Sequence, residues 1–392
     1  MLSRYLFLAL ILGCTSSPAN AFASGAASLL ASYPFEAGVT HVDGNYAFTK
    51  ENYLVEGARK ISALGSPAIF IYMTNKYATQ YPDKGNALFG NPKNLTDLAS
   101  SPAYKQVFNM PFKIYVITVF TFANGDGIFR TMKPNAAVAA EEQAEIYNLT
   151  KYLYATYRGS HKSFILKNWE SDWFGMRNYD ATKPISADNL ADLVNWLKAR
   201  QAGVTQARNE AGDPSDVAVL NAVEVNRPLD WIEKRLPRVL NGVVPYVGSD
   251  MLTYSSYDST TQSPLETMKG EFIKALNGED QYAPDPLGLG KRRILISEYG
   301  LYENEHPEDV NIGHLQDILD TAKKWGASGA FLWDLFDNEC TLPDKKTSAP
   351  VATNAGEVGY PTNALCRGLW WVRPDGTTSA AAEMVKAYWT GQ

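Results

Sequence analysis

The sequence predicts an α/β protein built as a closed barrel. Short apolar runs alternate with segments of helical periodicity eight times along the 392 residues, and such alternation is typical of a parallel sheet. Eight units favour a (β/α)8 TIM barrel over an open sheet. No composition break or linker separates the units, so we expect residues 22–392 to form a single domain. Each unit takes about 40 residues, and the surplus predicts extended loops on the C-terminal face.

The expected strands are rich in β-branched and aromatic residues and are bounded by turn residues. They cover residues 38–44, 67–73, 114–120, 164–170, 217–223, 246–254, 294–298 and 329–333. The sixth of these runs is the least regular. Helical periodicity follows at residues 54–61, 95–108, 136–157, 190–197, 231–240, 265–276, 312–322 and 380–389.

The charge balance does not suggest a nucleic-acid partner. The chain has 36 basic and 42 acidic residues, a net charge of −6, and no basic run, whereas nucleic-acid-binding domains carry a basic patch or stripe. Aromatic residues make up 12% of the chain. Many lie at strand ends or in loops, where they are suited to stacking on sugar rings.

The first 21 residues have the pattern of a secretory signal. Arg4 gives a charged start, residues 5–13 are mostly apolar, and residues 19–21 form a small-x-small site, so we expect cleavage after Ala21. The apolar run is too short to span a bilayer, and we expect a secreted or periplasmic protein without a transmembrane segment. Lipid anchoring at Cys14 is the alternative, because residues 11–14 resemble a lipoprotein cleavage box.

Removal of the signal leaves two cysteines, Cys340 and Cys366. In an oxidising compartment this even pair favours one disulfide, and two unpaired thiols are the alternative. The four histidines, at positions 41, 161, 306 and 314, form no ligand cluster. We therefore expect no metal site and no cofactor.

Two carboxylates are expected at the functional end of the barrel. Glu298 ends the seventh strand, and Glu170 ends the fourth strand on the face shared by Leu166 and Asn168. Catalytic groups of such barrels lie at the carboxyl ends of strands, and strands four and seven lie on opposite sides. A carboxylate pair across this mouth is what glycoside hydrolysis requires. The alternative is that each glutamate is a salt-bridged residue of the barrel end.

The chain resembles the clan A glycoside hydrolases. The resemblance rests on residues 296–300 as nucleophile strand, 329–334 as eighth strand, 250–258 as sixth strand and 367–376 as the barrel end. It implies Glu170 as acid/base and Glu298 as nucleophile. The clan usually has Asn directly before its acid/base, whereas here Trp169 separates Asn168 from Glu170. Asp172 and Glu224 are therefore competing acid/base candidates.

The remaining candidates are expected to bind the sugar. We assign Glu224 and Asn226, at the end of the fifth strand, to sugar hydroxyls, with a structural hydrogen-bonding role as the alternative for Glu224. Trp169, Trp173 and Trp333 can stack on pyranose faces, although one is expected to be a core residue. Tyr254 and Tyr257 can donate to Glu298 and lower its pKa, and one of them is expected only to pack. Asn168 and Asp172 complete the predicted binding site, and Asp43 is a further hydroxyl binder.

The sequence thus predicts a secreted glycoside hydrolase that acts on a polysaccharide or oligosaccharide. Glu170 acts as acid and then base, and Glu298 as nucleophile, in a retaining mechanism. An inverting mechanism is distinguished by a wider carboxylate separation, beyond about 6.5 Å. The alternative from another class is a non-catalytic carbohydrate-binding protein on a decayed barrel. A metal-dependent hydrolase would need ligands at strand ends that the sequence hardly offers.

Overall fold

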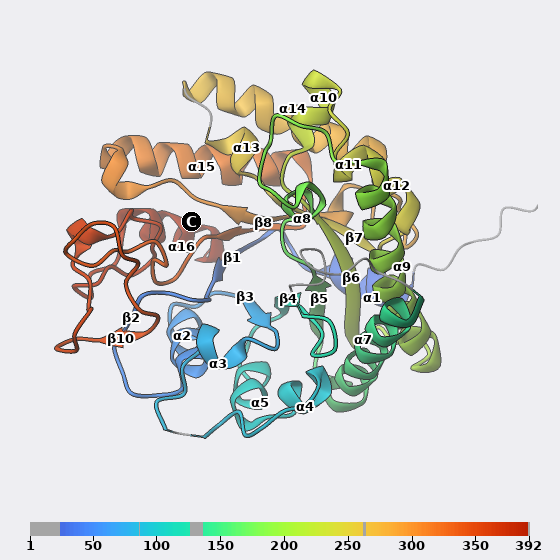
Figure 1. The fold of residues 1–392 in the computed structure, drawn as a ribbon, viewed down its shortest axis with the longest axis horizontal. Coiled ribbons are helices and arrows are strands. Elements are labelled where there is room, and N and C mark those ends of the chain that lie inside the picture. Colours follow the sequence, from blue (N-terminus) through green and yellow to red (C-terminus); the bar gives the residue numbers. More distant parts are fainter. Residues whose placement is uncertain (1–23, 86, 126–135, 262–263, 391–392) are drawn as a thin grey trace, which may run out of the picture.

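The computed structural model describes residues 24–85, 87–125, 136–261 and 264–390. Eight parallel strands close into a barrel in the order β1-β3-β4-β5-β6-β7-β8-β9, with helices around them (Figure 1). The predicted (β/α)8 fold is therefore confirmed. The predictions about residues 1–21 and Cys14 lie outside the described residues.

The barrel strands are short and almost entirely buried, as expected for a parallel sheet covered on its outer face by helices. They are β1 (Glu36–Thr40), β3 (Ala68–Met73), β4 (Ile114–Val119), β5 (Lys162–Lys167), β6 (Val217–Val225), β7 (Met251–Ser255), β8 (Ile294–Tyr299) and β9 (Gly329–Leu332). The barrel closes where β1 pairs with β9 in register from Glu36 to Val39. Gly38 permits this closure, because a Cβ atom there would lie 2.2 Å from the ring of Phe331.

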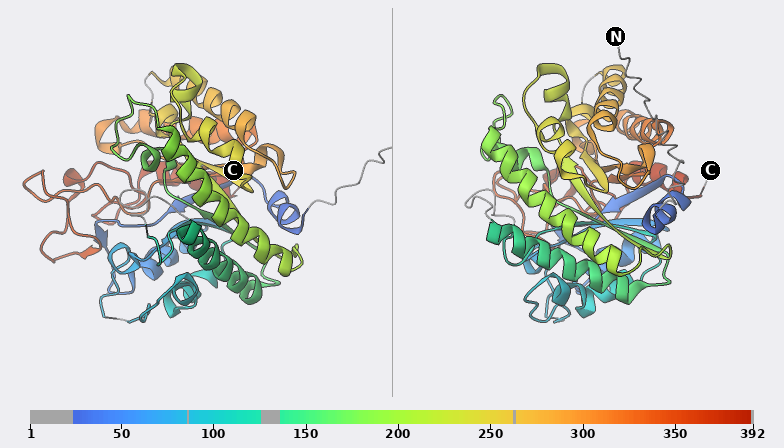
Figure 2. Two further views of the ribbon diagram at one scale, coloured as in Figure 1. Left: turned by 45° about the vertical axis from the view of Figure 1, so that its right-hand side comes forward. Right: turned by 90° about the vertical axis from the view of Figure 1, so that its right-hand side faces the viewer.

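The long helices lie on the outside of the barrel, and α7 packs beside α9 (Figure 2). The helices are α1 (Gly25–Ser32), α2 (Tyr53–Ala63), α3 (Tyr77–Gln80), α4 (Leu95–Ala99), α5 (Pro102–Phe108), α7 (Ala136–Tyr157), α8 (Ser171–Met176), α9 (Ala187–Glu210), α10 (Pro228–Lys234), α11 (Val239–Gly242), α12 (Val244–Val247), α13 (Tyr257–Thr260), α14 (Leu265–Tyr282), α15 (Glu308–Trp325) and α16 (Ala380–Thr390). Within the described ranges, no helix is both long and apolar enough to cross a bilayer.

The short helix α1 was not predicted, and it covers the N-terminal side of the barrel. The carboxylate of Asp213 accepts hydrogen bonds from the backbone N–H groups of Gly25 and Ala26 at the start of the helix. At its end, Arg292 donates to the carbonyl oxygens of Leu30 and Tyr33. A carboxylate at the N-terminus and a guanidinium at the C-terminus both complement the helix dipole.

Three predicted elements differ in the structure. The sixth strand is only Met251–Ser255, because residues 239–247 form α11 and α12 and Gly248 turns the chain at φ 69°. The predicted helix 95–108 divides into α4 and α5, where Ser101 caps the second helix and Pro102 starts it. The predicted helix 231–240 divides into α10 and α11.

The fourth strand also has a different inward face from the predicted one. The ring of Phe164 packs edge-on against Phe108 and at a tilt against Tyr157 on the helical side of the sheet. Leu166, two residues later, shares that outer face, and Lys167 points inward, over the ring of Phe70. Because β5 ends at Lys167, strand alternation does not extend to Glu170. The prediction that Glu170 shares an inward face with Leu166 is therefore wrong, because Leu166 faces outward and Glu170 lies beyond the end of the strand.

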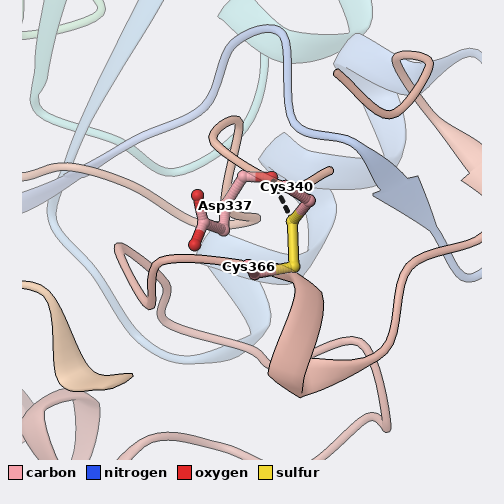
Figure 3. A group of neighbouring side chains, drawn as sticks. All are labelled: Asp337, Cys340 and Cys366. Atoms are coloured by element: carbon pink, nitrogen blue, oxygen red, sulfur yellow. Dashed lines mark hydrogen bonds between the residues drawn. A yellow bond between two sulfur atoms is a disulfide. The ribbon is translucent and has the colours of Figure 1, made fainter. Parts of the chain in front are cut away.

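The chain after β9 forms a long loop over the C-terminal face, where the two-stranded sheet of β2 (Tyr46–Ala47) and β10 (Thr353–Asn354) also lies. The predicted disulfide between Cys340 and Cys366 is confirmed and joins two parts of this loop (Figure 3). Asp337 lies beside it and accepts backbone hydrogen bonds from Gly368 and Leu369. Although these three side chains are close enough to surround an ion, the disulfide occupies both sulfur atoms.

Candidate active site

Glu170 and Glu298 lie at the carboxyl ends of β5 and β8 and contact the same hydroxyl group. Ser255, the last residue of β7, places its Oγ atom 2.7 Å from Glu170 Oε1 and 3.3 Å from Glu298 Oε2. The two carboxylate oxygens are therefore separated by at most about 6 Å, which is below the ~6.5 Å at which the spacing of inverting enzymes begins. The structure thus brings the two predicted catalytic carboxylates together.

The pKa values of both carboxyl groups are raised. Burial, followed by the neighbouring charge of Glu224, raises the pKa of Glu170 to about 7. The same two causes raise the pKa of Glu298 well above its ordinary value, against the opposing effect of Lys167. The prediction of a low pKa for Glu298 is therefore not supported. Two carboxyl groups this close titrate as a pair, and the pair retains a proton near neutral pH.

Glu224 is fully buried beneath this pair and is engaged by protein donors. Its Oε1 atom accepts from Lys167 Nζ at 2.6 Å and from the Ser297 hydroxyl, and its Oε2 atom accepts from the backbone N–H of Glu170 at 2.8 Å. These contacts favour the structural alternative for Glu224 over binding to a sugar hydroxyl. Glu224 holds the main chain of Glu170 in place.

A register shift in β8 brings two successive side chains to the site. The pairing of β8 is irregular both opposite Tyr254 and Ser255 and between Ile296 and Tyr299. Ser297 and Glu298 consequently both form hydrogen bonds with groups at the barrel mouth, although a regular strand would direct one of them outward. Irregularities of this kind often re-aim side chains near active sites.

The other predicted polar residues, Asn168, Asp172 and Asn226, form hydrogen bonds that connect the chain after β5 with the end of β6. Asn168 donates to Ser171 and to the carbonyl of Trp169, and its Oδ1 accepts from the N–H of Glu224. The Asp172 carboxylate is buried and accepts three backbone hydrogen bonds, from Asn226, Arg227 and Val239. Asn226 accepts from the N–H of Asp172 and also lines the groove. These bonds leave Asp172 poorly placed as acid/base or sugar ligand.

The two tyrosines have different positions. Tyr254 donates to Asp258 and lies 2.6 Å from the Ser259 hydroxyl, so it is the tyrosine of the two that does not donate to Glu298, as the sequence analysis expects of one of them. Tyr257 lines the cavity that contains the carboxylates of Glu170 and Glu298. Burial, followed by the charges of Glu298 and Glu170, raises its pKa well above the ordinary value, which keeps the hydroxyl protonated and able to donate.

The carboxylate pair lies in the central one of three neighbouring cavities that share lining residues. The central cavity has a volume of about 410 Å³ and contains Glu170, Glu298 and Trp173. It shares Trp169, Trp333 and Asn338 with a cavity of about 390 Å³ over the ends of β1, β3 and β4, where Asp43 lies. It shares Arg227, Tyr257 and Asp258 with a third cavity of about 480 Å³ beyond β6 and β7. The three cavities lie next to one another across the barrel mouth, and together they are called the groove.

Sequence reasoning missed several residues of this site. Lys167 and Ser255 contact the carboxylate pair, and Asn338 and Glu339 reach the groove from the loop after β9. A lysine directly after the apolar run of residues 164–166 is a usable signal for the first, because an unpaired buried charge is costly. The loop residues carried no such signal, because no periodicity fixes the path of a long loop.

Fold and site together define a (β/α)8 barrel with one carboxylate after its fourth strand and another in its seventh. No family model matches the sequence, and no curated protein matches it. Among solved structures, the chain is similar to the exo-β-1,4-mannosidase Op5Man5 from Opitutaceae bacterium strain TAV5, with a TM-score of 0.56, 13% identity and coverage of 91% of this chain and 59% of that chain. The chain thus spans less than two thirds of the mannosidase.

Two further solved structures show the same fold. GH5_18 from Streptomyces cattleya in complex with GlcNAc has a TM-score of 0.56, 11% identity and coverage of 92% of this chain and 81% of that chain. A GH5 xyloglucan-specific endo-β-1,4-glucanase from a metagenomic library, in complex with cellotriose, has a TM-score of 0.52, 11% identity and coverage of 94% and 99%. The resemblance to clan A glycoside hydrolases is confirmed at the level of the fold.

Proposed function

We propose that the protein is a glycoside hydrolase that cleaves a polysaccharide or oligosaccharide with retention of anomeric configuration. The observation that carries the proposal is the contact of Glu170 and Glu298 with one Ser255 hydroxyl, at 2.7 and 3.3 Å. The distance favours direct attack by a carboxylate, because an inverting enzyme needs room for a water molecule between the sugar and its base.

In the first step Glu170 donates its proton to the glycosidic oxygen while Glu298 attacks the anomeric carbon. The bond between that carbon and the leaving oxygen breaks, and the leaving sugar departs with the proton. In the second step Glu170, now an anion, takes a proton from water as the water oxygen attacks the anomeric carbon, and Glu298 leaves as a carboxylate. The raised pKa of Glu170, about 7, suits a group that acts as acid and then as base.

The groove supports cleavage within a chain rather than at its end. Cavities continue from the central one toward β1 on one side and toward β6 and β7 on the other. Sugar units can therefore occupy both sides of the scissile bond, and Trp169 and Trp333 border the junction with the first cavity. We propose endo action, with short oligosaccharides rather than single sugars as early products. The disulfide is compatible with the proposed secretion.

The test is a panel of purified polysaccharides with product masses as the readout, followed by Glu298→Ala on the glycan that is cleaved. Loss of the nucleophile should abolish turnover, and azide should restore it with formation of a glycosyl azide of inverted configuration. Glu305→Ala is the matched control, because this carboxylate is exposed on the loop after β8 and pairs with Arg367. Near-normal turnover by Glu298→Gln would refute the mechanism.

The same panel tests the non-catalytic alternative. The Trp insertion between Asn168 and Glu170 was its support in the sequence, but β5 ends at Lys167 and the turn that follows carries Glu170 to the pair. A binding protein should be retarded by a glycan in affinity electrophoresis and should release no products at any pH. Product release that depends on Glu298 excludes it.

A further inference from the structure

Lys167 carries a positive charge into the interior of the barrel, directly beneath the catalytic pair. Its ammonium group lies 2.6 Å from Glu224 Oε1 and 3.9 Å from Glu298 Oε1, and its side chain has no solvent exposure. We propose that Lys167 is a positioning residue that keeps Glu298 anionic whenever its carboxylate is not bonded to the sugar, while Glu224 holds Lys167. The inference rests on the proposed retaining function.

The cost of burying this lysine indicates a specific role. A buried ammonium group loses its hydration, and only pairing with an opposite charge offsets that cost. Glu224 supplies the pairing, and the ring of Phe70 covers the ammonium at 4.5 Å. A well-packed apolar residue often fills such a site without loss of stability. A charge retained beside the catalytic carboxylates is therefore better explained by its effect on them.

The contact with Glu224 leaves further N–H donors of the Lys167 ammonium group available. It has three protons, and one accounts for the contact with Glu224. Glu298 Oε1 is buried and has no hydrogen-bond partner among the described residues, although Lys167 lies 3.9 Å from it. The other oxygen of Glu298 contacts Ser255. Lys167 is thus positioned to stabilise negative charge on the oxygen that Ser255 does not reach.

Burial and several groups near Glu298 raise its pKa, whereas Lys167 lowers it. Titratable groups from other elements that face or influence Glu298 are Glu170, Glu224, Tyr72, Tyr257 and Asp334, together with Lys167 itself. The carboxylates disfavour a further negative charge, and the two tyrosines are neutral donors. Lys167 is the cation of this group.

The reaction uses an anionic Glu298 twice. It attacks the anomeric carbon as a carboxylate in the first step and departs as a carboxylate in the second. A cation at 3.9 Å stabilises the departing charge in the second step. Removal of Lys167 should therefore slow hydrolysis of the glycosyl-enzyme more than its formation, so that kcat and KM fall together.

The test must avoid an uncompensated buried carboxylate, because Lys167→Met alone would leave Glu224 unpaired. The informative comparison is between Glu224→Gln and the double variant Lys167→Met/Glu224→Gln, in both of which residue 224 is uncharged. Lys162→Met is the control on the same strand. Lys162 lies at the opposite end of β5, where its ammonium contacts the carbonyl oxygens of Met110 and Phe112.

The first readout needs no substrate. The pKa of Glu298 is measured by 13C NMR on protein labelled at the glutamate carboxyl carbon, with the signal assigned by its absence in Glu298→Gln. We expect the pKa of Glu298 to be higher in the double variant than in Glu224→Gln by about one unit or more, since a cation within 4–6 Å shifts a carboxyl group by that amount. Equal pKa values in the two proteins would overturn the inference.

The second readout uses the glycan that the wild-type protein cleaves. The acidic limb of the kcat/KM profile should move to higher pH in the double variant relative to Glu224→Gln, and kcat and KM should both fall. Lys162→Met should retain the wild-type acidic limb. An unchanged limb in the double variant contradicts the inference. If the wild-type protein cleaves no glycan, the proposed function fails, and the NMR titration still decides whether Lys167 controls the charge of Glu298.

Discussion

The carboxylate of Glu224 accepts a hydrogen bond from the backbone N–H of Glu170 at 2.8 Å. The acid/base candidate is therefore held through its main chain, which leaves its carboxyl group free to contact Ser255 and the groove. The same Glu224 carboxylate pairs with Lys167 at 2.6 Å. One buried side chain thus fixes the position of Glu170 and the location of the cation near Glu298.

Glu224→Ala should be strongly destabilising, because it leaves the ammonium of Lys167 buried without its partner. Loss of one member of a buried ion pair typically costs about 3–5 kcal/mol. Chemical denaturation monitored by tryptophan fluorescence measures the free energy of unfolding. The matched control is Glu383→Ala, which removes a more exposed pair with Lys386 and should cost less than about 1 kcal/mol. Similar losses in the two variants would contradict the role assigned to Glu224.

The activity should decline as the pH rises above about 7. Glu170 must be protonated to assist departure of the leaving sugar, and its pKa is about 7. The basic limb of kcat/KM should therefore reflect this group. In Glu170→Ala, a dinitrophenyl glycoside of the appropriate sugar needs no proton on its leaving group, so Glu298 should displace dinitrophenolate and form the glycosyl-enzyme without that limb. Retention of the limb in this variant would assign it to another residue.

The free energy of unfolding should fall between about pH 6.5 and about pH 8.5. Burial raises the pKa of Glu170 to about 7 and that of Asp258 to about 8, so the folded protein binds protons that the unfolded chain has already lost. Stability contributed by such groups is present at low pH and is lost as the pH passes through their folded pKa values. We expect a loss on the order of 2 kcal/mol.

Urea unfolding at the two pH values measures this difference. The histidine His41 acts in the opposite direction, because burial lowers its pKa to about 4. Its effect is confined to pH values below about 6.5, where the unfolded histidine takes up a proton. A higher unfolding free energy at the more alkaline pH would show that the buried acids are not protonated as described.

Removal of the disulfide should weaken glycan binding as well as stability. Cys340 and Cys366 are 26 residues apart, and loss of such a crosslink typically costs about 3 kcal/mol. The crosslinked loop carries Asn338 and Glu339 on one side and Leu369 on the other into the central cavity. We expect Cys340→Ala/Cys366→Ala to raise KM several-fold at a temperature where the variant remains folded. An unchanged KM would show that the crosslinked loop does not contribute to substrate binding.

Much of the fold follows from the sequence because buried parallel strands leave a strong local signal. The runs at 67–73, 114–120 and 329–333 correspond closely to β3, β4 and β9, and α7 has the predicted bounds. The sixth strand was displaced because an apolar run that contains Pro245 and Gly248 suits short helices as well as a strand. Local pattern does not distinguish the two, and tertiary packing decides.

The sequence predicts the two carboxylates of the candidate site but not the buried residues that hold them in place. A glutamate after an apolar strand is a local feature, and both Glu170 and Glu298 were found in this way. The role of Glu224 depends on its contacts with Lys167 on β5 and Ser297 on β8. These three residues are far apart in the sequence, and no periodicity joins them. The sequence left open which of Tyr254 and Tyr257 only packs, and the contact that identifies Tyr254 is with Asp258, which accepts its hydroxyl.

The pairing of β1 with β9 joins the first barrel strand to the last one. Leu332, the last residue of β9 in this pairing, directly precedes Trp333, whose side chain lines the central cavity. The pairing that seals the barrel therefore also fixes where the ring of Trp333 lies, so that one contact between the two ends of the chain completes both the core and a wall of the candidate site.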